Sequence, residues 1–319
     1  MRRALPSVPS LRGLKQSENP KQSASRFGEC LMPQKASPTG FGRLLRFARN
    51  DVRLRLLAMA LLTATLVSAQ DSTFQLLRSI RVEASDFAVD GLENLYVVTP
   101  TGLLKKYGPA GDSVAVFNNV RRFGRLYSLD VSNPLRPLLF YKDFSTVVLL
   151  DRLLSQKAVL DLRRARIAQA SAAATSYDNN IWIFDAVENK LRKLDESGRL
   201  LMETPDFRQL FSFDFVPEKI VDGDKAVYLF DPRAGVLVFD YYGTYQRRYP
   251  VESWALLGVL DRQLIGVQGG SLVLLNTGTL LQRQYQFPSS FGGFQRYLVG
   301  NSKLFALGKD SVNVYRVGF

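Results

Sequence analysis

Residues 179–198 read NNIWIFDAVENKLRKLDESG, and this stretch decides the fold. It contains two short apolar runs, Ile181–Phe184 and Leu191–Leu194, with polar residues between and after them. Isoleucine and the aromatic residues favour β-strands, whereas Asp, Asn and Gly favour turns. The stretch therefore predicts two neighbouring strands joined by a turn.

The same pair of runs recurs along the chain. Six copies of the first run begin at Leu95, Leu138, Ile181, Val227, Leu264 and Leu304, at spacings of 43, 43, 46, 37 and 40 residues. A second run follows each copy, at Leu103–Tyr107, Val147–Leu150, Leu191–Leu194, Leu237–Phe239, Leu272–Leu275 and Val312–Tyr315. An internal period of this length is typical of β-propellers and other repeat folds.

Further strands flank each pair. Outer strands are predicted at Ser113–Asn118, Lys157–Leu162, Arg199–Thr204, Thr244–Tyr249 and Leu281–Phe287, and inner strands at Asp86–Asp90, Leu126–Val131 and Ala255–Leu260. Four strands about every 40 residues predict an all-β fold, a six-bladed β-propeller of four-stranded blades. A β-sandwich or jelly roll is the alternative, but neither requires a repeat.

The two ends of the repeat region complement each other. The sixth unit stops at Phe319 after three strands, and Phe74–Val82 is a spare strand near the other end. We expect this N-terminal strand to complete the last blade and close the ring, which removes free sheet edges.

Three units carry a more specific pattern. They read DFAVDGLENLYVV (residues 86–98) with Gly111, the stretch quoted above with Gly198, and VYLFD (227–231) with VLVFD (236–240) and Gly243. This pattern resembles the repeat of NHL-type and TolB-like six-bladed propellers. The resemblance implies the fold only, because such folds host many functions.

The positive charge is concentrated before the repeats. The chain has a formal net charge of +13, of which residues 1–51 contribute +7. The modest excess on the remaining body is not the footprint of a nucleic-acid-binding protein. Arg53 and Arg55 precede the apolar run Leu56–Val67, and Val67-Ser68-Ala69 fits a cleavage site before Gln70. This arrangement predicts a secretory signal peptide.

Three segments follow from this interpretation. Residues 1–51, rich in Ser, Pro, Gln and Lys, are expected to be disordered and to precede the true start, with translation beginning near Val52. Residues 52–69 form the signal peptide, and 70–319 form the propeller. We expect no transmembrane segment in the mature chain, since the apolar run is well short of the roughly 20 residues that span a bilayer.

The residue counts exclude several kinds of chemistry. The chain contains no histidine and one cysteine, Cys30. A Ser-His-Asp or Cys-His nucleophile, a histidine zinc site and an internal disulfide are therefore impossible. We name no catalytic residue and expect a protein without enzymatic activity.

Arginines are the best candidate binding residues. They follow predicted outer strands or open an inner one, at Arg121, Arg122, Arg125, Arg163, Arg164, Arg166 and Arg296. We expect these connections to share one face of the ring and to form a basic rim around the central channel. Such a rim binds carboxylate, phosphate or an acidic protein surface. The alternative is a merely charged set of loops, with Asp143, Asp185, Glu188 and Asp231 weakening the positive field.

Four acids lie on or beside predicted inner strands, namely Asp86, Asp90, Asp130 and Glu218. In some propeller hydrolases, channel carboxylates hold calcium. Here most of them occupy repeat positions, where a carboxylate usually caps turn amides. We therefore expect no cofactor, with calcium at these acids as the alternative. Asp222-Gly223-Asp224 is interpreted as a strand turn, not as a calcium loop.

We therefore expect an exported, non-enzymatic propeller that acts as a protein-binding or scaffold subunit in the bacterial cell envelope. It would be periplasmic or secreted, with an envelope protein as partner, and outer-membrane or secretion machinery is one setting. Two alternatives stay open. One is a lactonase-type or glycan-processing hydrolase that uses channel carboxylates and a divalent cation. The other is a sensor of anionic small ligands.

Overall fold

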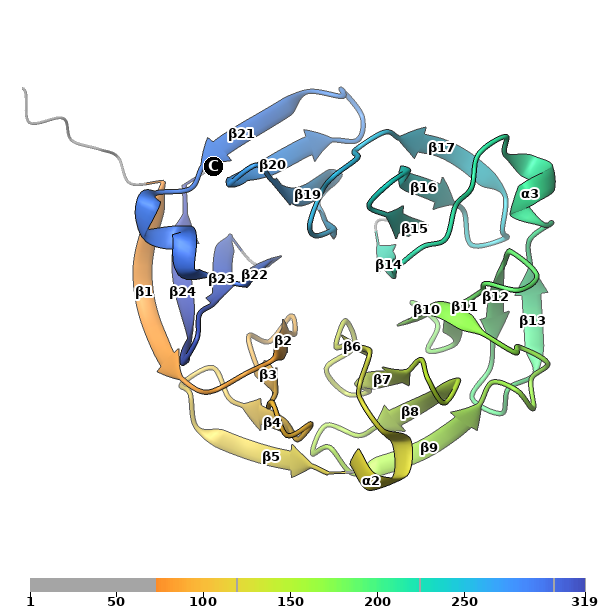
Figure 1. Ribbon diagram of the computed structural model, residues 1–319, viewed down its shortest axis with the longest axis horizontal. Coiled ribbons are helices and arrows are strands. Elements are labelled where there is room, and N and C mark those ends of the chain that lie inside the picture. The colour runs from red at the N-terminus through yellow and green to blue at the C-terminus, as the bar shows by residue number, and fades with distance from the viewer. Residues whose placement is uncertain (1–72, 119, 224, 301, 319) are drawn as a thin grey trace, which may run out of the picture. The chain divides into compact units, whose positions relative to one another are not determined.

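A computed structural model describes residues 73–118, 120–223, 225–300 and 302–318. They form six sheets of four antiparallel strands, arranged in a ring around a central channel (Figure 1). This is the expected six-bladed β-propeller. The predicted N-terminal extension, the signal peptide and Cys30 lie outside the described residues.

Strands follow one another in each blade from the channel to the outer edge (Figure 1). Blades one to three contain β2 (Asp86–Val89), β3 (Leu95–Val98), β4 (Leu104–Tyr107), β5 (Ser113–Phe117), β6 (Ser128–Asp130), β7 (Leu138–Tyr141), β8 (Thr146–Leu150), β9 (Gln156–Asp161), β10 (Ala170–Thr175), β11 (Ile181–Asp185), β12 (Lys190–Leu194) and β13 (Leu200–Glu203). Blades four and five contain β14 (Lys219–Gly223), β15 (Ala226–Asp231), β16 (Gly235–Phe239), β17 (Tyr245–Tyr249), β18 (Gly258–Leu260), β19 (Gln263–Gln268), β20 (Ser271–Asn276) and β21 (Gln282–Gln286).

The sixth blade joins both ends of the described chain. It contains β22 (Arg296–Gly300), β23 (Lys303–Leu307), β24 (Ser311–Val317) and β1 (Phe74–Arg81). β1 pairs antiparallel with β24, from Phe74 opposite Val317 to Arg81 opposite Ser311. The predicted closure by the N-terminal strand is therefore confirmed.

Middle strands hold most of the core. All residues of β3, β7 and β11 are buried, because each blade packs its two faces against its neighbours, whereas the outer strand β5 is largely exposed. This explains why the middle strands are continuous apolar runs in the sequence. Trp182 is fully buried between blades three and four. Burying one such side chain contributes about 2–3 kcal/mol.

Phenylalanines of the connection after blade three extend this core. Phe207 and Phe215 are buried, and Phe211 and Phe213 pack partly buried against the same cluster. The Phe207 ring lies 5.1 Å from that of Phe184. These aromatic residues therefore belong to the core between blades three and four.

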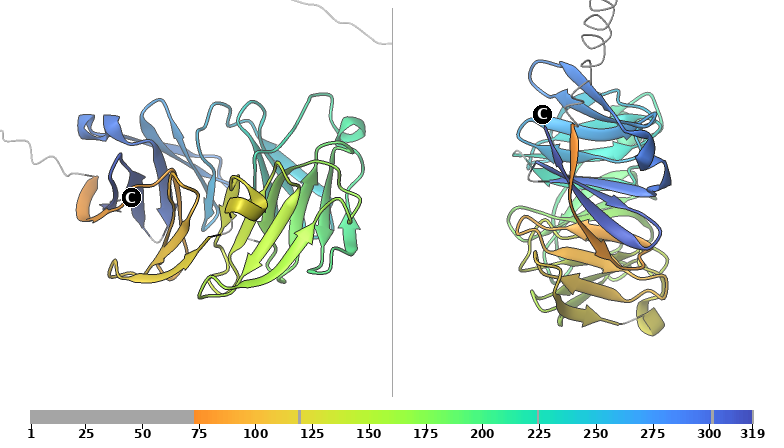
Figure 2. Two further views of the ribbon diagram at one scale, coloured as in Figure 1. Left: turned by 60° about the horizontal axis from the view of Figure 1, so that its bottom comes forward. Right: turned by 90° about the vertical axis from the view of Figure 1, so that its left-hand side faces the viewer.

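Antiparallel blades place alternate turns on alternate faces. One face of the ring, which we name the connection face, carries two kinds of loop. These are the turns between the second and third strands of each blade and the connections from each blade to the next. This face carries the short helices α2 (Val120–Phe123), α3 (Phe207–Leu210) and η1 (Ser289–Gly293). The edge-on view in Figure 2 shows α2 and η1 projecting from the same side. The remaining turns emerge on the opposite face.

No helix within the described residues is long and apolar enough to cross a membrane.

Candidate functional site: an arginine pocket at the edge of blade two

The structure brings three of the seven predicted arginines into one pocket. Arg122 lies on α2, and Arg163 and Arg164 follow β9, so the pocket forms where blade one connects to blade two (Figure 1). Its volume is about 550 Å³. This falls within the roughly 300–1,000 Å³ of small-molecule sites. The other lining residues are Phe123, Phe144, Thr146, Val159, Leu160, Asp161, Ala165, Ser197 and Gly198.

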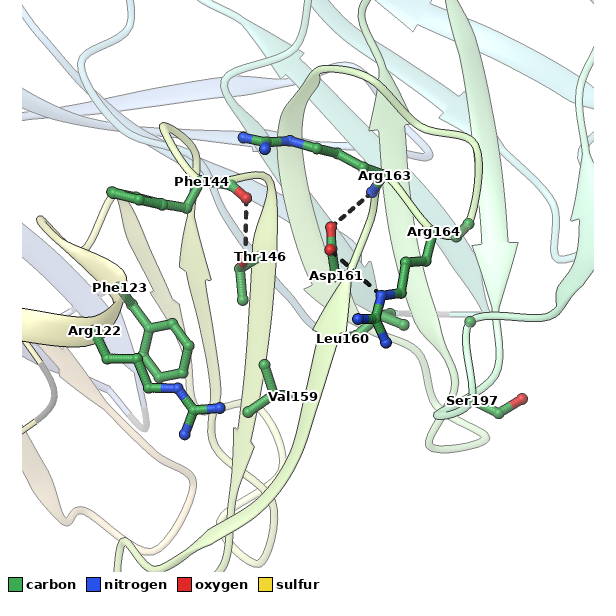
Figure 3. A pocket seen from close by; sticks show the side chains of 12 residues that line it. Arg122, Phe123, Phe144, Thr146, Val159, Leu160, Asp161, Arg163, Arg164 and Ser197 are labelled. Atoms are coloured by element: carbon green, nitrogen blue, oxygen red, sulfur yellow. Dashed lines mark hydrogen bonds and ion pairs between the residues drawn. The ribbon is translucent and has the colours of Figure 1, made fainter.

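The guanidinium groups are barely neutralised. Figure 3 shows Arg122, Arg163 and Arg164 around the pocket with Asp161 between them. The Arg164 Nε lies 3.8 Å from Asp161 Oδ2, with the Arg164 side chain 90% exposed. Asp161 Oδ1 accepts a hydrogen bond from the backbone N–H of Arg163 at 3.1 Å. Three arginines thus face one acid among the lining residues, which leaves a net charge of +2.

Apolar groups complete the pocket. Phe144 is half exposed, and the Arg122 guanidinium carbon lies 4.9 Å from the centre of the Phe123 ring. Phe123 itself is buried. A guanidinium over an aromatic face is held in place while its N–H donors stay open. The pocket can therefore take a ligand that combines an acidic group with an apolar one.

Three of the four acids that were expected to weaken the positive field are bound elsewhere, whereas Asp143 is exposed next to Phe144. Asp185 and Glu188 each accept a hydrogen bond of 2.6 Å from the buried Arg192, and Glu203 accepts one of 3.1 Å. Asp231 accepts from the backbone N–H of Val216 at 3.0 Å and pairs with Arg233. Since none of these acids lines the pocket, they leave its charge in place.

The other four predicted arginines do not line this pocket. Arg121, Arg125 and Arg166 are exposed on the connection face. Arg296 opens β22, and its Nη1 lies 2.8 Å from Asp86 Oδ2 at the start of β2. The helix α2 and the strand β9, which carry or precede the pocket arginines, lie at the outer edge of the ring, whereas β22, which begins at Arg296, lies beside the channel (Figure 1).

Charges of both signs meet on the inner strands. Burial raises the pKa of Asp86, although the charge of Arg296 partly opposes the shift. Lys219 is the first residue of β14. Desolvation lowers the pKa of its ammonium, and the positive charge of Arg296 lowers it further. The negative charges of Asp130 and Asp86 oppose this shift. The Lys219 ammonium donates to the carbonyl of Leu257 at 2.9 Å. Two acids and two basic residues thus meet in the channel, whereas three arginines face one acid in the pocket.

The candidate metal-binding acids lie in separate arrangements. Asp90 caps its turn by accepting from the N–H groups of Leu92 and Asn94, both at 2.9 Å. Asp130 accepts from the N–H of Ser132 at 2.9 Å and of Thr175 at 2.6 Å. Asp86 pairs with Arg296, and Glu218 is exposed before β14. Within residues 73–318, leaving aside three undescribed positions, no group of three or more acids is arranged to hold a metal ion.

Sequence reasoning did not find the full pocket. It identified the arginines but not Asp161, Phe144 or the turn residues Ser197 and Gly198 of blade three. The available signal was the order of residues Asp161-Leu162-Arg163-Arg164 at the end of a predicted outer strand. An aspartate there caps the following turn and stays beside the arginines.

Together, the ring and the pocket define a class of protein, a six-bladed β-propeller with a basic pocket at its outer edge. No protein-family model and no curated protein matches the chain. Among solved structures, it is similar to selenomethionine-substituted virginiamycin B lyase from Staphylococcus aureus, with a TM-score of 0.55 and 10% identity over 77% of this chain and 100% of that one.

Two further solved structures are similar to a comparable degree. A streptogramin B lyase has a TM-score of 0.52 and 12% identity over 73% of this chain and 78% of its own. The Pan2 WD40 domain of Neurospora crassa has a TM-score of 0.51 and 11% identity over 77% of this chain and 96% of its own. At such identities these likenesses show the propeller fold alone. The resemblance to NHL-type and TolB-like repeats stays a prediction.

Proposed function

We propose that this chain is an exported, non-enzymatic propeller that acts as a protein-binding scaffold in the bacterial cell envelope. It takes an acidic segment of its partner at the pocket of Arg122, Arg163 and Arg164. The observation that carries the proposal is the cluster of three exposed arginines, which face one acid, Asp161, among the residues that line the pocket.

The chemistry of the pocket suits a carboxylate-bearing peptide. Each guanidinium offers a planar set of N–H donors that matches a carboxylate with two parallel hydrogen bonds. Phe144 provides an exposed apolar surface beside them. The ring holds the backbone of the site in place, so that binding has to order only the arginine side chains.

Export is the second part of the proposal. It is supported by Arg53, Arg55, the apolar run Leu56–Val67 and the small residues before Gln70. Expression of the full coding region in a bacterial host, followed by N-terminal sequencing of the exported protein, tests this part. We expect the exported chain to begin at Gln70. A protein that stays in the cytoplasm with residues 52–69 still attached would contradict the proposed export.

Affinity purification from gently solubilised envelopes tests the binding role. The probe is the tagged mature chain, compared with the double variant Arg163→Glu/Arg164→Glu. We expect a stoichiometric partner with the native chain and at least a tenfold lower yield with the variant. Binding should also weaken with salt, because exposed charges are screened.

A matched variant controls for the change in net charge. Arg121→Glu/Arg125→Glu alters the same number of exposed arginines nearby but leaves the pocket lining intact. It should retain most of the partner. Equal loss in both double variants would assign the effect to overall charge and overturn the pocket as the binding site.

A sensor of anionic small ligands is the second candidate, and the pocket volume of about 550 Å³ favours it. Calorimetric titration with inorganic phosphate and with citrate separates the two candidates. Saturable binding lost in Arg163→Glu/Arg164→Glu, without any co-purifying protein, supports the sensor.

The similarity to lyases supports no lyase activity here. A variant of the Staphylococcus aureus virginiamycin B lyase in which one histidine is replaced by alanine is catalytically inactive. The present chain contains no histidine.

A further inference from the structure

A second organised surface lies on the opposite face, between blades three and four. Its residues come from the turn after β10, the end of β14 and the turn after β16. The rings of Tyr177 and Tyr241 stack with their centres 4.1 Å apart and an angle of 21° between their planes. We name Tyr177 and Tyr241, with the side chains that fix them, the tyrosine platform.

One carboxylate holds this platform together. Asp222 Oδ1 accepts the hydroxyl of Tyr241 at 2.9 Å. Its Oδ2 accepts the indole N–H of Trp182 at 2.9 Å, the backbone N–H of Tyr177 at 3.1 Å and the hydroxyl of Ser176 at 3.2 Å. Four donors on one side chain fix both the ring of Tyr241 and the backbone of Tyr177.

A lysine fills the space beneath the rings. Lys193 lies opposite Trp182 on the neighbouring strand. Its ammonium is 4.9 Å from the centres of the Tyr177 and Trp182 rings and 5.9 Å from that of Tyr241. Asp178 pairs with it at 2.5 Å. Burial alone would raise the pKa of Asp178, but hydrogen bonds from Lys193 and other groups lower it. The cation is therefore part of the framework and is not available to a ligand.

Tyr177 is nevertheless open to solvent, with 63% of its surface exposed. Tyr242 follows Tyr241 in the same turn and is 88% exposed. Large exposed aromatic rings are usually mobile, whereas the Tyr177 ring is stacked and its backbone is hydrogen-bonded. A fixed, exposed aromatic face loses little entropy when a flat ligand stacks on it.

The surrounding charges limit the chemistry of that ligand. A cation would be repelled by Lys193, which already occupies the cage of three rings. An anion would meet the carboxylates of Asp178 and Asp222. A neutral ring with an apolar face and polar edges fits best, because its C–H face covers Tyr177 while its hydroxyls stay hydrated or reach nearby polar groups.

We propose that the tyrosine platform is a carbohydrate-binding site that stacks a neutral pyranose ring of a glycan on Tyr177. The site lies apart from the arginine pocket and shares no lining residue with it. The proposal is therefore independent of the function proposed above.

Saturation-transfer NMR with the purified mature chain tests this proposal. The probes are neutral oligosaccharides, namely cellohexaose, chitohexaose and maltohexaose. We expect transfer to the ring protons of at least one of them, and at least a tenfold weaker affinity for Tyr177→Ala. Because Tyr177 is exposed, this variant should keep its fold, which the amide spectrum verifies.

Tyr127→Ala is the matched control. Tyr127 is 39% exposed and also has a lysine, Lys142, at 4.6 Å from its ring centre. It lies on the connection face, away from the platform. This variant should bind the sugar as the native chain does.

Three outcomes would overturn the proposal. One is the absence of saturation transfer to all three oligosaccharides with a folded protein. Another is equal affinity in Tyr177→Ala and the native chain. The third is sugar binding that is lost in Arg163→Glu/Arg164→Glu instead, which would assign it to the arginine pocket.

Discussion

The arginine pocket and the tyrosine platform are built in opposite ways on the same ring. In the pocket, Arg163 and Arg164 are exposed and have few contacts within the protein. In the platform, a single carboxylate, Asp222, accepts four hydrogen bonds from two blades. The pocket arginines can bind a partner because the fold leaves their charges largely unpaired. The platform rings are held in place because the buried polar groups behind them are hydrogen-bonded within the protein. Substitution of the exposed pocket residues should therefore change the stability of the fold little, whereas substitution of Asp222, which holds the platform from behind, should lower it.

Replacing the two aspartates provides the largest test of this difference. Asp222→Ala leaves the Trp182 indole and the Tyr241 hydroxyl without their acceptor, and each unsatisfied buried donor costs about 1–3 kcal/mol. We expect a loss of about 3 kcal/mol in the free energy of unfolding. Asp161→Ala in the pocket should lower it by only about 1 kcal/mol, since its ion pair with Arg164 is exposed and only one hydrogen bond, from the backbone N–H of Arg163, is lost. Guanidinium denaturation followed by tryptophan fluorescence measures both.

Asp222→Asn provides the control for charge. It keeps an oxygen acceptor for part of the network and should lie between the native chain and Asp222→Ala. If Asp161→Ala destabilised the protein as much as Asp222→Ala, the contrast between the two regions would be wrong.

The fold could be predicted from the sequence because a propeller repeats its hydrogen-bonding pattern in every blade. The apolar runs at Ile181 and Leu191 became β11 and β12, and the spare segment at Phe74 became β1. These features depend on local strand preference and on a count of strands, and neither needs any knowledge of contacts between side chains. Strand ends shifted by up to three residues, as at β18 (Gly258–Leu260) against the expected Ala255–Leu260.

The site was only partly predictable, because its residues meet across blades. Three of the seven arginines share a pocket, and which three depends on where α2 lies against β9. Arg192, which was not singled out, binds three carboxylates and removes two expected acids from the connection face. Pairing of charges is a tertiary property, so a list of arginines could not reveal which ones stay free.

A simple rule could have found Asp222. Ser176 and Trp182 donate to it across 46 and 40 residues, and Thr175 donates to Asp130 across 45. These separations match one repeat, because residues one repeat apart lie in adjacent blades. Asp222, in a turn that the sequence predicts, lies 40 residues after Trp182, which is about one repeat. A buried indole N–H needs an acceptor, so this spacing indicates Asp222 as its partner.

A glycine substitution sharpens the comparison at the pocket wall. Gly198 has a φ of +86°, and an added Cβ would lie 2.7 Å from Leu160 Cδ1. Both residues line the pocket. Alanine at a positive φ costs about 1 kcal/mol, and displacement of the buried Leu160 adds to it. We expect Gly198→Ala to lose about 2 kcal/mol in denaturation experiments and to weaken partner binding as well.

Gly111 offers the matched control for strain alone. It occupies the equivalent turn of blade one with a φ of +91°, and an added Cβ would meet nothing within 4 Å. Gly111→Ala should therefore lose only about 1 kcal/mol. Equal losses in the two variants would show that Leu160 moves aside freely and that the pocket wall is not rigid.

The smallest effect concerns Tyr241 of the platform at alkaline pH. Burial, followed by the hydrogen bond to Asp222, raises the pKa of Tyr241 above its ordinary value. An unfolded tyrosine ionises near pH 10. The stabilising contribution of the folded, neutral phenol is therefore complete below pH 10 and is lost as the pH rises above it. For Tyr241 this amounts to at most about 1.4 kcal/mol at pH 11.

Tyr241→Phe should reduce the fall in unfolding free energy between pH 9 and pH 11. Some fall should persist, because burial also raises the pKa of Tyr141 to about 12. The variant lacks the hydrogen bond to Asp222 at every pH, so the slope and not the absolute stability is the informative quantity. An unchanged slope in Tyr241→Phe would mean that the Tyr241 hydroxyl is as solvated in the folded chain as in the unfolded one. In that case Asp222 would not fix the platform through this ring.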